Sequence, residues 1–500
     1  MYKMLANNLS FDFFIADKYR IWRTVLLFSL FFTVNLVLFS TNFTGIKFPN
    51  DGVYYLNIAE NLINHGLFQD TISVPINPAV THQNGIVFCL VVLKLVFGKY
   101  CFVAYVVLIS VLWFYALKKM YELARYLGIS KTVSIILGFV MYTKPEILTS
   151  NLSLSNESIY LPLCYYAVSD FLIKLNGNNR DKNNALLYLF LVIGLFFRNQ
   201  HITILFTLFF SAWMFKLDER KAVTIFSIMG GLLFFIYVGL TPHLINQNLV
   251  NESFVIGNRF SLEKISFVLR QFANIYMPGF FFVKYVVFNL LLGLVFFSLF
   301  LFGLWKICNQ EKYKRLGILL ILLIGSNSLF LFVLPFSDDR YSVVMHFYIL
   351  LVQVSILTGF RKSIQKTIPV MFVIVTISLF ALILFKYVNG TKGRVPVYGM
   401  LKQYEEYKTL PDIKNENIIY FSESPRMTYW MLEKSSCDLS PAECAEYFKY
   451  DEKTSDMVYF GSITKFNNRK QLAGYKVADC LISKCKNYGI WRIEKIPALK

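Results

Sequence analysis

Charged side chains are scarce in this 500-residue sequence, and acidic ones are the scarcest. Only 16% of the residues are charged, with 31 Asp and Glu against 50 Lys and Arg. Hydrophobic residues make up 56%, which is more than a soluble protein of this length needs to fill its core. The composition therefore excludes a soluble protein and predicts a polytopic membrane protein. The net charge of +19 does not indicate nucleic-acid binding, because the cations fall between apolar runs, where membrane topology accounts for them.

Several other features are missing. The sequence has no internal repeat, no low-complexity tract and, among its five histidines, no His-x-x-x-His spacing. We therefore predict no metal site among these residues. The sequence identifies no cofactor, and a requirement for a divalent cation is left open. The apolar run 21–39 is too long for a cleavable signal peptide and has no small-residue cleavage site, so we expect it to act as a signal anchor.

Apolar runs of roughly membrane-spanning length recur as far as Tyr387, and they predict about eleven transmembrane helices. The expected spans are 21–39, 101–117, 132–142, one that begins at Glu157, 185–197, 202–215, 222–240, three that end at Trp305, Pro335 and Arg361, and 367–387. Strongly basic short loops fall on one side of this path. They predict a cytoplasmic N-terminus, with the first loop and the C-terminal tail outside.

The chain changes character after residue 387. Residues 388–500 are polar and evenly patterned, so we divide the chain into a transmembrane catalytic domain, 1–387, and a small extracytoplasmic α/β domain, 388–500. The segment ENIIYFSESPRMTYWML is typical of a strand, a turn and a helix, and DMVYFGSI and YGIWRIEKI are typical of further strands. The four tail cysteines, Cys437, Cys444, Cys480 and Cys485, have the wrong spacing for a zinc knuckle. In an oxidising compartment they favour two disulfides whose pairing the sequence leaves open.

The stretch 49–68 is the most informative. Asn50 or Asp51 can cap a helix that Gly66 ends, and Tyr54 and Tyr55 lie on its apolar side while asparagines line the other side. We expect this helix to lie along the outer membrane surface. The apolar run 86–97 is short for a crossing, so it is interpreted as a second interfacial helix.

The ionisable residues of the outer segments gather where spans meet the surface, a depth at which charges are costly and indicate function. An acid facing cations suits glycosyl transfer from a lipid phosphate: the carboxylate takes a proton from the acceptor, and the cations stabilise the departing phosphate. The candidate catalytic residues are Asp51, Glu60 and Glu157. The candidates for binding the donor phosphate or substrate are Arg198, Arg340, Tyr341, Tyr55, His82 and Lys144. The alternatives are structural: Asp51 as a cap, Glu60 as a solvated residue, and Arg340 paired with Asp338 and Asp339.

A family resemblance rests on short motifs over roughly the first 360 residues. They are Asp51 after the first span, the Tyr-x-x-x-Ala-x-x-Leu-x-x-x-Gly pattern from Tyr55 to Gly66, the prolines Pro75 and Pro78, Leu154 to Ser158 opening a span, Gly194 to Arg198, and Asp339-Arg340-Tyr341. With these motifs the chain resembles the GT-C type integral membrane glycosyltransferases, which include protein O-mannosyltransferases and lipid A aminoarabinose transferases. It departs from many of them in having Asp51-Gly52 where they have paired acids.

The resemblance implies a GT-C-like α-helical membrane fold, a catalytic Asp51 and a polyprenyl-phosphate sugar as donor. It implies a glycan, lipid or protein acceptor, and membrane lipids as further partners. The size, the 50 phenylalanines and the outward tail are similar to serotype-converting O-antigen glucosyltransferases, which implies transfer of a hexose to lipopolysaccharide. Asn-x-Ser/Thr triplets in the outer segments would crowd the site if glycosylated, which favours a bacterial inner membrane.

Two other functions compete with this interpretation. An O-antigen polymerase or ligase would also use undecaprenyl-linked sugars outside the membrane. A polyprenyl-linked glycan transporter or flippase would place its ionisable groups near the bilayer midplane, often in repeated halves. The expected charges lie at the outer surface instead, so the sequence favours a transferase.

Overall fold

The computed structural model describes the following parts of the chain: five residues between 29 and 36, then 50–66, 68–74, 77–78, 84–151, 154–175, 184–240, 262–273, 286–333 and 342–356. In the tail it describes 403–404, 406–410, 418–422, 434–437, 441–449, 456–462, 475–482 and 488–496, with single residues and one pair between these segments. The fold below is the fold of these residues.

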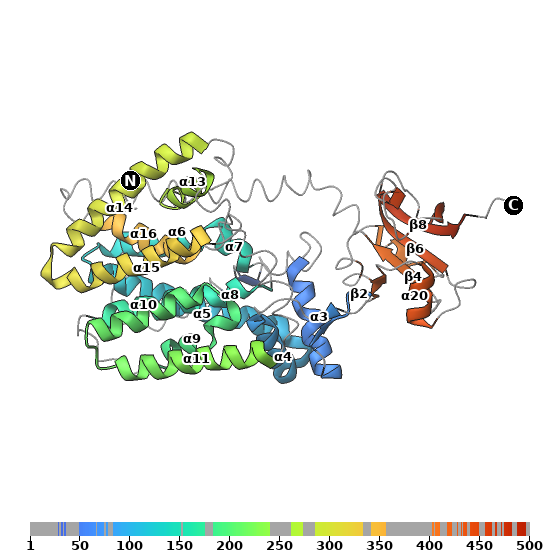
Figure 1. Ribbon diagram of the computed structural model, residues 1–500, viewed down its shortest axis with the longest axis horizontal. Helices are drawn as coiled ribbons and strands as arrows, with labels where there is room; N and C mark the ends of the chain where they lie inside the picture. The colour runs from blue at the N-terminus through green and yellow to red at the C-terminus, as the bar shows by residue number, and fades with distance from the viewer. Residues whose placement is uncertain are drawn as a thin grey trace, which may run out of the picture.

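Helices make up the larger part of the structure (Figure 1). They are α3 (Asn50–His65), α4 (Gly85–Phe97), α5 (Cys101–Tyr126), α6 (Lys131–Tyr142), α7 (Pro145–Asn151), α8 (Asn156–Lys174), α9 (Ala185–Phe197), α10 (His201–Met214), α11 (Arg220–Leu240), α13 (Leu262–Arg270), α14 (Val286–Cys308), α15 (Lys314–Val333) and α16 (Val343–Ser355), with short 3-10 helices at Gly98–Tyr100 and Glu311–Tyr313. Apolar runs become helices because a helix satisfies its backbone hydrogen bonds internally, which a bilayer requires.

These helices agree with the predicted spans. Within the described residues, α5, α6, α8, α9, α10, α11, α14, α15 and α16 each coincide with an expected span. Most of the expected first span, and all of 367–387, lie outside the described residues. By length and composition, four helical segments in the described part can cross a membrane: 85–126, 220–239, 290–308 and 311–332. Four shorter apolar helices accompany them, namely α6, α9, α10 and α16.

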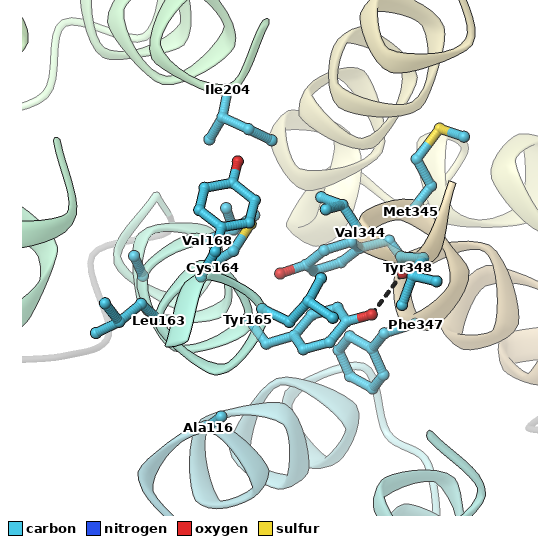
Figure 2. Packing of buried hydrophobic residues seen from close by; sticks show 14 of the residues in the cluster. Ala116, Leu163, Cys164, Tyr165, Val168, Ile204, Val344, Met345, Phe347 and Tyr348 are labelled. Atoms are coloured by element: carbon cyan, nitrogen blue, oxygen red, sulfur yellow. Dashed lines mark hydrogen bonds between the residues drawn. The ribbon is translucent and has the colours of Figure 1, made fainter. Parts of the chain in front are cut away.

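Helix α8 lies at the centre of the bundle. Every residue of α8 except Tyr166 is buried, and the helix contacts α5, α7, α9 and α16. Its Tyr165 points toward α16, where Phe347 and Tyr348 surround the ring and the hydroxyl donates to the carbonyl of Val343 (Figure 2). The middle of α8 is apolar on all sides, as is typical of a buried helix, while its polar residues lie toward the two ends.

Two basic segments differ from the prediction. Residues 118–125 were expected in a cytoplasmic loop, but α5 continues as a helix to Tyr126 and carries Lys118, Lys119 and Arg125. Lys174 was expected in the next basic loop, but it is the last residue of α8 and is buried beside Asp170. Hydropathy predicts only where an apolar run ends. A helix can continue past that point, and both α5 and α8 extend beyond their apolar runs.

The expected outer loop 241–283 contains a packed helix. In α13, Leu269 lies so close to Gly293 of α14 that a side chain at Gly293 would overlap its backbone. The turn after α13 is also packed into the bundle, since Gln353 of α16 donates to the carbonyl of Phe272 at 3.2 Å and Gln271 is 0% exposed. The many charges around α13 concealed its apolar face in the sequence.

The tail forms a small α/β unit. Its sheet has the order β4 (Ile418–Ser422), β6 (Asp456–Ser462), β8 (Tyr488–Lys495) and β7 (Tyr475–Cys480), in which β4 and β6 are parallel and the other pairs are antiparallel. The strands β4, β6 and β8 confirm the three predicted ones, whereas β7 and helix α20 (Pro441–Phe448) were not predicted. Alternate residues of β4 face two separate apolar clusters, as the two-residue period of a strand requires.

The tail unit contains disulfide-bonded cysteines. Cys437 and Cys444 form a disulfide with their Cα atoms 6.2 Å apart. Cys480 is also disulfide-bonded, and Cys485 lies outside the described residues.

The first outer loop contains three short strands. β1 (Gln69–Asp70) pairs with β3 (Asn77–Pro78), and β2 (Ser73–Val74) pairs in parallel with β5 (Ser436–Cys437) of the tail. The tail therefore contacts the bundle at the end where α3 and α4 lie (Figure 1). This contact puts the tail on the same side of the bundle as the first outer loop.

Candidate active site

The first turn of α8 joins three helices at the end of the bundle where α3 and α4 lie, which the sequence predicts to be the outer end. Asn156 accepts a hydrogen bond from the backbone N–H of Ile86 in α4 at 3.0 Å, and donates to the hydroxyl of Tyr55 in α3 at 3.4 Å. Two residues further on, Ser158 and the hydroxyl of Tyr105 in α5 are 2.5 Å apart. Polar side chains at the start of α8 therefore hold α3, α4 and α5 around one point.

Helix α3 carries the predicted catalytic aspartate at its beginning. Asp51 is the second residue of α3, and its side chain is not among those described. Tyr55 follows one turn later, a rise of about 6 Å, so the backbone of Asp51 lies one turn from the contact with Asn156. The helix ends at His65, and Gly66 has a φ of 67°, which confirms the predicted glycine stop.

The polar face of α3 is covered, contrary to the expectation for a helix lying on a membrane surface. Asn57 and Asn61 are buried beneath the loop that follows the helix. The Asn57 side chain accepts from the backbone N–H of Thr71 and donates to its hydroxyl, both at 2.9 Å, while Asn61 donates to the carbonyl of Gln69 at 3.0 Å. Buried amides need such partners, so these asparagines fix the loop against the helix.

A buried ion pair lies next to this junction. Glu157, the second residue of α8, pairs with Arg198, which follows α9 directly, and both side chains are almost fully buried. The turn that carries Arg198 is tight because Gly194 lies against the ring of His201, where any larger residue would overlap it. The structure thus brings two predicted site residues together.

A second polar cluster lies deeper in the bundle. Lys144 Nζ is 2.7 Å from His346 Nδ1 in α16 and 3.8 Å from a carboxylate oxygen of Glu146. His346 Nε2 is 3.1 Å from Gln271 Oε1, which also accepts from the hydroxyl of Ser342 at 2.5 Å. The start of α16 contacts Tyr165 of α8. Tyr165 lies nine residues after Asn156, which corresponds to about 13 Å along the axis of α8.

The donors and acceptors in this cluster determine the form of His346. An ammonium group only donates, so Nδ1 must accept from Lys144 and the ring proton must be on Nε2. That proton is then donated to Gln271. With this assignment the histidine is neutral and holds Lys144 in place without adding charge.

Glu60 occupies a different position. It pairs with Lys94 of α4, and both side chains are about one-third exposed. Glu60 lies nine residues after Asp51 in α3, or about 13 Å along the helix axis. The contact favours a role in joining α3 to α4, and it accounts for Lys94 inside an otherwise apolar run.

The remaining predicted residues cannot be located. His82, Arg340 and Tyr341 lie outside the described residues. Within the described part of the chain, no group of three or more His, Cys, Asp or Glu side chains could hold a metal ion.

Sequence reasoning did not identify Asn156, Gln271, Ser342 and His346 as site residues. For His346 a signal was present, because a histidine in the apolar run VVMHFYILLVQVS must find a polar partner. Gln271 had no such signal, because it falls in a segment that reads as a polar loop.

Basic side chains and helix N-termini gather in this part of the bundle, with the carboxylates of Glu157 and Glu146 beside them. Arg198 and Lys144 supply buried cations. Helices α8 and α10 both begin beside the Glu157–Arg198 pair, and a helix N-terminus carries partial positive charge. A carboxylate beginning α3 and two buried cations are the groups that transfer from a phosphate-linked donor requires.

Comparisons with known proteins bear on the fold. The sequence matches no protein-family model, and no curated protein matches it. Among solved structures, the crystal structure of ArnT from Cupriavidus metallidurans bound to undecaprenyl phosphate matches with a TM-score of 0.52 and 11% sequence identity, covering 93% of this chain and 97% of that one. The Archaeoglobus fulgidus oligosaccharyltransferase tethered to an acceptor peptide gives a TM-score of 0.46 at 9% identity, over 89% of this chain and 70% of that one. Both are GT-C glycosyltransferases, and the likeness to ArnT confirms the expected resemblance at the level of the fold.

Proposed function

We propose that this protein is a membrane glycosyltransferase that moves a sugar from a polyprenyl-phosphate donor to an acceptor on the outer face of a bacterial inner membrane. The observation that carries the proposal is the set of buried charges at the outer end of the bundle, where Arg198 and Glu157 lie beside the start of α3. The fold is shared with ArnT, a protein solved with undecaprenyl phosphate bound. The same carrier class is therefore the first donor to consider.

In this proposal Asp51 is the general base. It takes the proton from the acceptor hydroxyl as that oxygen forms a bond to the anomeric carbon of the sugar. The bond between this carbon and the phosphate oxygen breaks, and polyprenyl phosphate leaves with the bonding electrons. The start of α3 favours an ionised carboxylate, because the free N–H groups of a first turn stabilise an anion.

The cations stabilise the leaving phosphate. A guanidinium group has five N–H donors, which is more than one carboxylate can accept, so Arg198 can bind Glu157 and a phosphate together. Arg340, near the start of α16 in the chain, is the second candidate, and Lys144 supplies a deeper positive charge. Tyr55, Tyr341 and His82 are proposed to contact the sugar or phosphate.

The finer assignment names the substrates. We propose a hexose, with glucose as the first sugar to test, and an O-antigen or other lipopolysaccharide glycan as the acceptor. The support is the resemblance to serotype-converting glucosyltransferases together with a separate α/β unit beside the first outer loop. The division into residues 1–387 and 388–500 belongs to the same proposal, with catalysis assigned to the first part.

The test is a comparison of surface glycans in bacteria with and without the gene. We expect one additional hexose per glycan repeat when the gene is present, detected by compositional analysis and mass spectrometry. Identical glycans at equal and verified membrane expression, in hosts that make the polyprenyl-phosphate hexose, would contradict the proposal. Longer glycan chains of unchanged composition would instead indicate a polymerase.

A further inference from the structure

One strand of the tail is paired with the loop that follows α3. β5 of the tail and β2 of the first outer loop lie in parallel, with Ser436 opposite Ser73 and Cys437 opposite Val74. The backbone N–H of Ser436 donates to the carbonyl of Ile72 at 3.1 Å. Next to it, the hydroxyl of Ser435 donates to the carbonyl of Thr71 at 2.5 Å.

Each strand is anchored in a different apolar core. Cys437 is 0% exposed and belongs to the tail cluster with Ile419 and Phe421, and its disulfide to Cys444 ties it to α20. On the other side, Ile72 is 2% exposed and belongs to the large cluster of the bundle. The strand pair therefore connects two packed bodies rather than two free loops.

The connection continues from the loop into α3. Thr71, whose carbonyl accepts from Ser435, is bound through its backbone N–H and hydroxyl to Asn57. Its hydroxyl also accepts from Asn61 at 3.0 Å. Both asparagines are on α3, the helix that begins with Asn50 and Asp51. A continuous series of hydrogen bonds thus runs from the tail to the helix that carries the proposed base.

We propose that the tail strand 435–437 is a positioning element that holds the first outer loop, and through it α3 and Asp51, in the geometry that transfer requires. This inference rests on the proposed function, because the catalytic role of Asp51 is part of that proposal. A displacement of about 1 Å at a reacting group can lower a rate by about 100-fold. The strand acts through α3 and touches no substrate.

A matched pair of substitutions at one position tests the inference. Ser436→Pro removes the N–H that donates to Ile72, because proline has none. Ser436→Ala keeps that N–H, and the hydroxyl that it removes is buried without a hydrogen-bond partner. Ser436→Ala therefore controls for the lost hydroxyl, whereas proline removes the N–H and also adds a ring at this buried position.

For Ser436→Pro we expect kcat to fall by about 10- to 100-fold, with KM for donor and acceptor unchanged within a factor of about three. Ser436→Ala should match the wild type. In hydrogen exchange, the amides of 69–74 and 57–61 should lose protection in the proline variant alone. A raised acceptor KM with unchanged kcat, or unchanged exchange in these amides, would overturn the inference. A wild-type protein without any transfer activity would instead overturn the proposed function, and the exchange result would still decide whether the strand holds the loop.

The cysteines give a second comparison that keeps the test valid if the proline variant does not fold. Replacing Cys437 and Cys444 by serine frees β5 from α20, so it should lower kcat and the protection of 69–74. Replacing Cys480 and Cys485 by serine removes the same number of cysteines, and Cys480 belongs to β7, which pairs with β8 and not with β2. This second variant should retain both properties. Equal losses in the two variants would mean that the tail contributes stability only, and would contradict the inference.

Discussion

Helix α8 carries a buried charge network at each end, and the two networks differ. At the inner end Asp170 is 1% exposed and accepts from Lys174 at 2.6 Å and from Lys119 at 3.0 Å. Lys119 also pairs with Glu122 at 3.0 Å. Lys118 reaches the same Glu122 at 3.9 Å, and all five of these residues are on α5 and α8. At the outer end Glu157 pairs with Arg198, and the neighbouring Asn156 contacts α3 and α4.

The difference shows that burial of charge does not identify an active site. A buried ion pair contributes little net stability but is costly to break, whatever its function. The inner network joins α5 to α8, and Lys174 extends it to Asn184 at the start of α9, so it helps to hold these helices together. The outer network gathers residues far apart in the sequence, and it lies beside the helix that begins with Asp51 and the loop that the tail holds. We therefore assign chemistry to the outer end and a structural role to the inner end.

The largest expected effect is at Asp51. Asp51→Asn keeps the size of the side chain and its ability to accept hydrogen bonds from the first turn of α3, of which it is the second residue, but removes its capacity to accept a proton. Transfer should fall by about two to four orders of magnitude. Membrane expression and thermal stability should stay at the wild-type level.

Asp51→Ala provides the contrast for this prediction. If the aspartate were only a cap, the asparagine variant would remain active and the alanine variant would lose stability, by about 1 kcal/mol. Rates for the two variants at matched protein levels separate these roles.

The next effect is expected at the Glu157–Arg198 pair. Each single glutamine variant leaves one buried charge without its partner, which costs about 3 to 5 kcal/mol. The double variant Glu157→Gln/Arg198→Gln removes both charges, so its stability should recover. If Arg198 binds the donor phosphate, the double variant should still transfer about 10- to 100-fold more slowly, since a lost charge-assisted hydrogen bond is worth about 1.5 to 3 kcal/mol. Recovery of activity along with stability would make the pair structural.

A smaller effect is expected at His346. His346→Asn retains an acceptor near the position of Nδ1, so it can still bind Lys144, whereas His346→Leu retains none. We expect the leucine variant to lose about tenfold in rate, from one hydrogen bond to a charged group, and the asparagine variant to lose less. Equal rates in both variants, measured at saturating donor, would exclude a positioning role for the histidine.

The smallest effect on transfer is expected at the inner end. Asp170→Asn leaves the buried Lys174 without its charged partner and Lys119 with Glu122 alone, and it should destabilise the protein by about 3 to 5 kcal/mol. The folded fraction should still turn over at the wild-type rate per molecule. The measurement is kcat per folded molecule, with the folded fraction taken from active-site titration and thermal unfolding. A lower kcat for fully folded Asp170→Asn than for the wild type would remove the distinction between the two ends.

The sequence predicted the helices of the bundle well because a bilayer leaves few alternatives to an apolar helix. The boundaries of α9 and the end of α3 at His65 were correct, since a glycine or a polar turn marks each end. In contrast, the sequence did not predict helix α13 or the burial of Gln271. Both depend on contacts with α14 and α16, which are distant in the sequence.

The site was predictable only in part, for the same reason. Charges at the ends of spans identified Glu157, Arg198 and Lys144, and the structure provides partners for each. No local pattern indicated that His346 would be the partner of Lys144, or that a tail strand would pair with the first outer loop. Such pairings depend on the tertiary arrangement and leave no local pattern.

The most direct measurement follows a labelled sugar with the purified protein in lipid vesicles. The donor is undecaprenyl-phosphate glucose with ¹⁴C in the sugar, and the acceptor is lipopolysaccharide. The account predicts that label moves to the acceptor while undecaprenyl phosphate appears in equal amount, and that neither change occurs with Asp51→Asn. Donor that crosses the bilayer with its sugar–phosphate bond intact, or label that remains on the carrier in the presence of acceptor, would contradict the account.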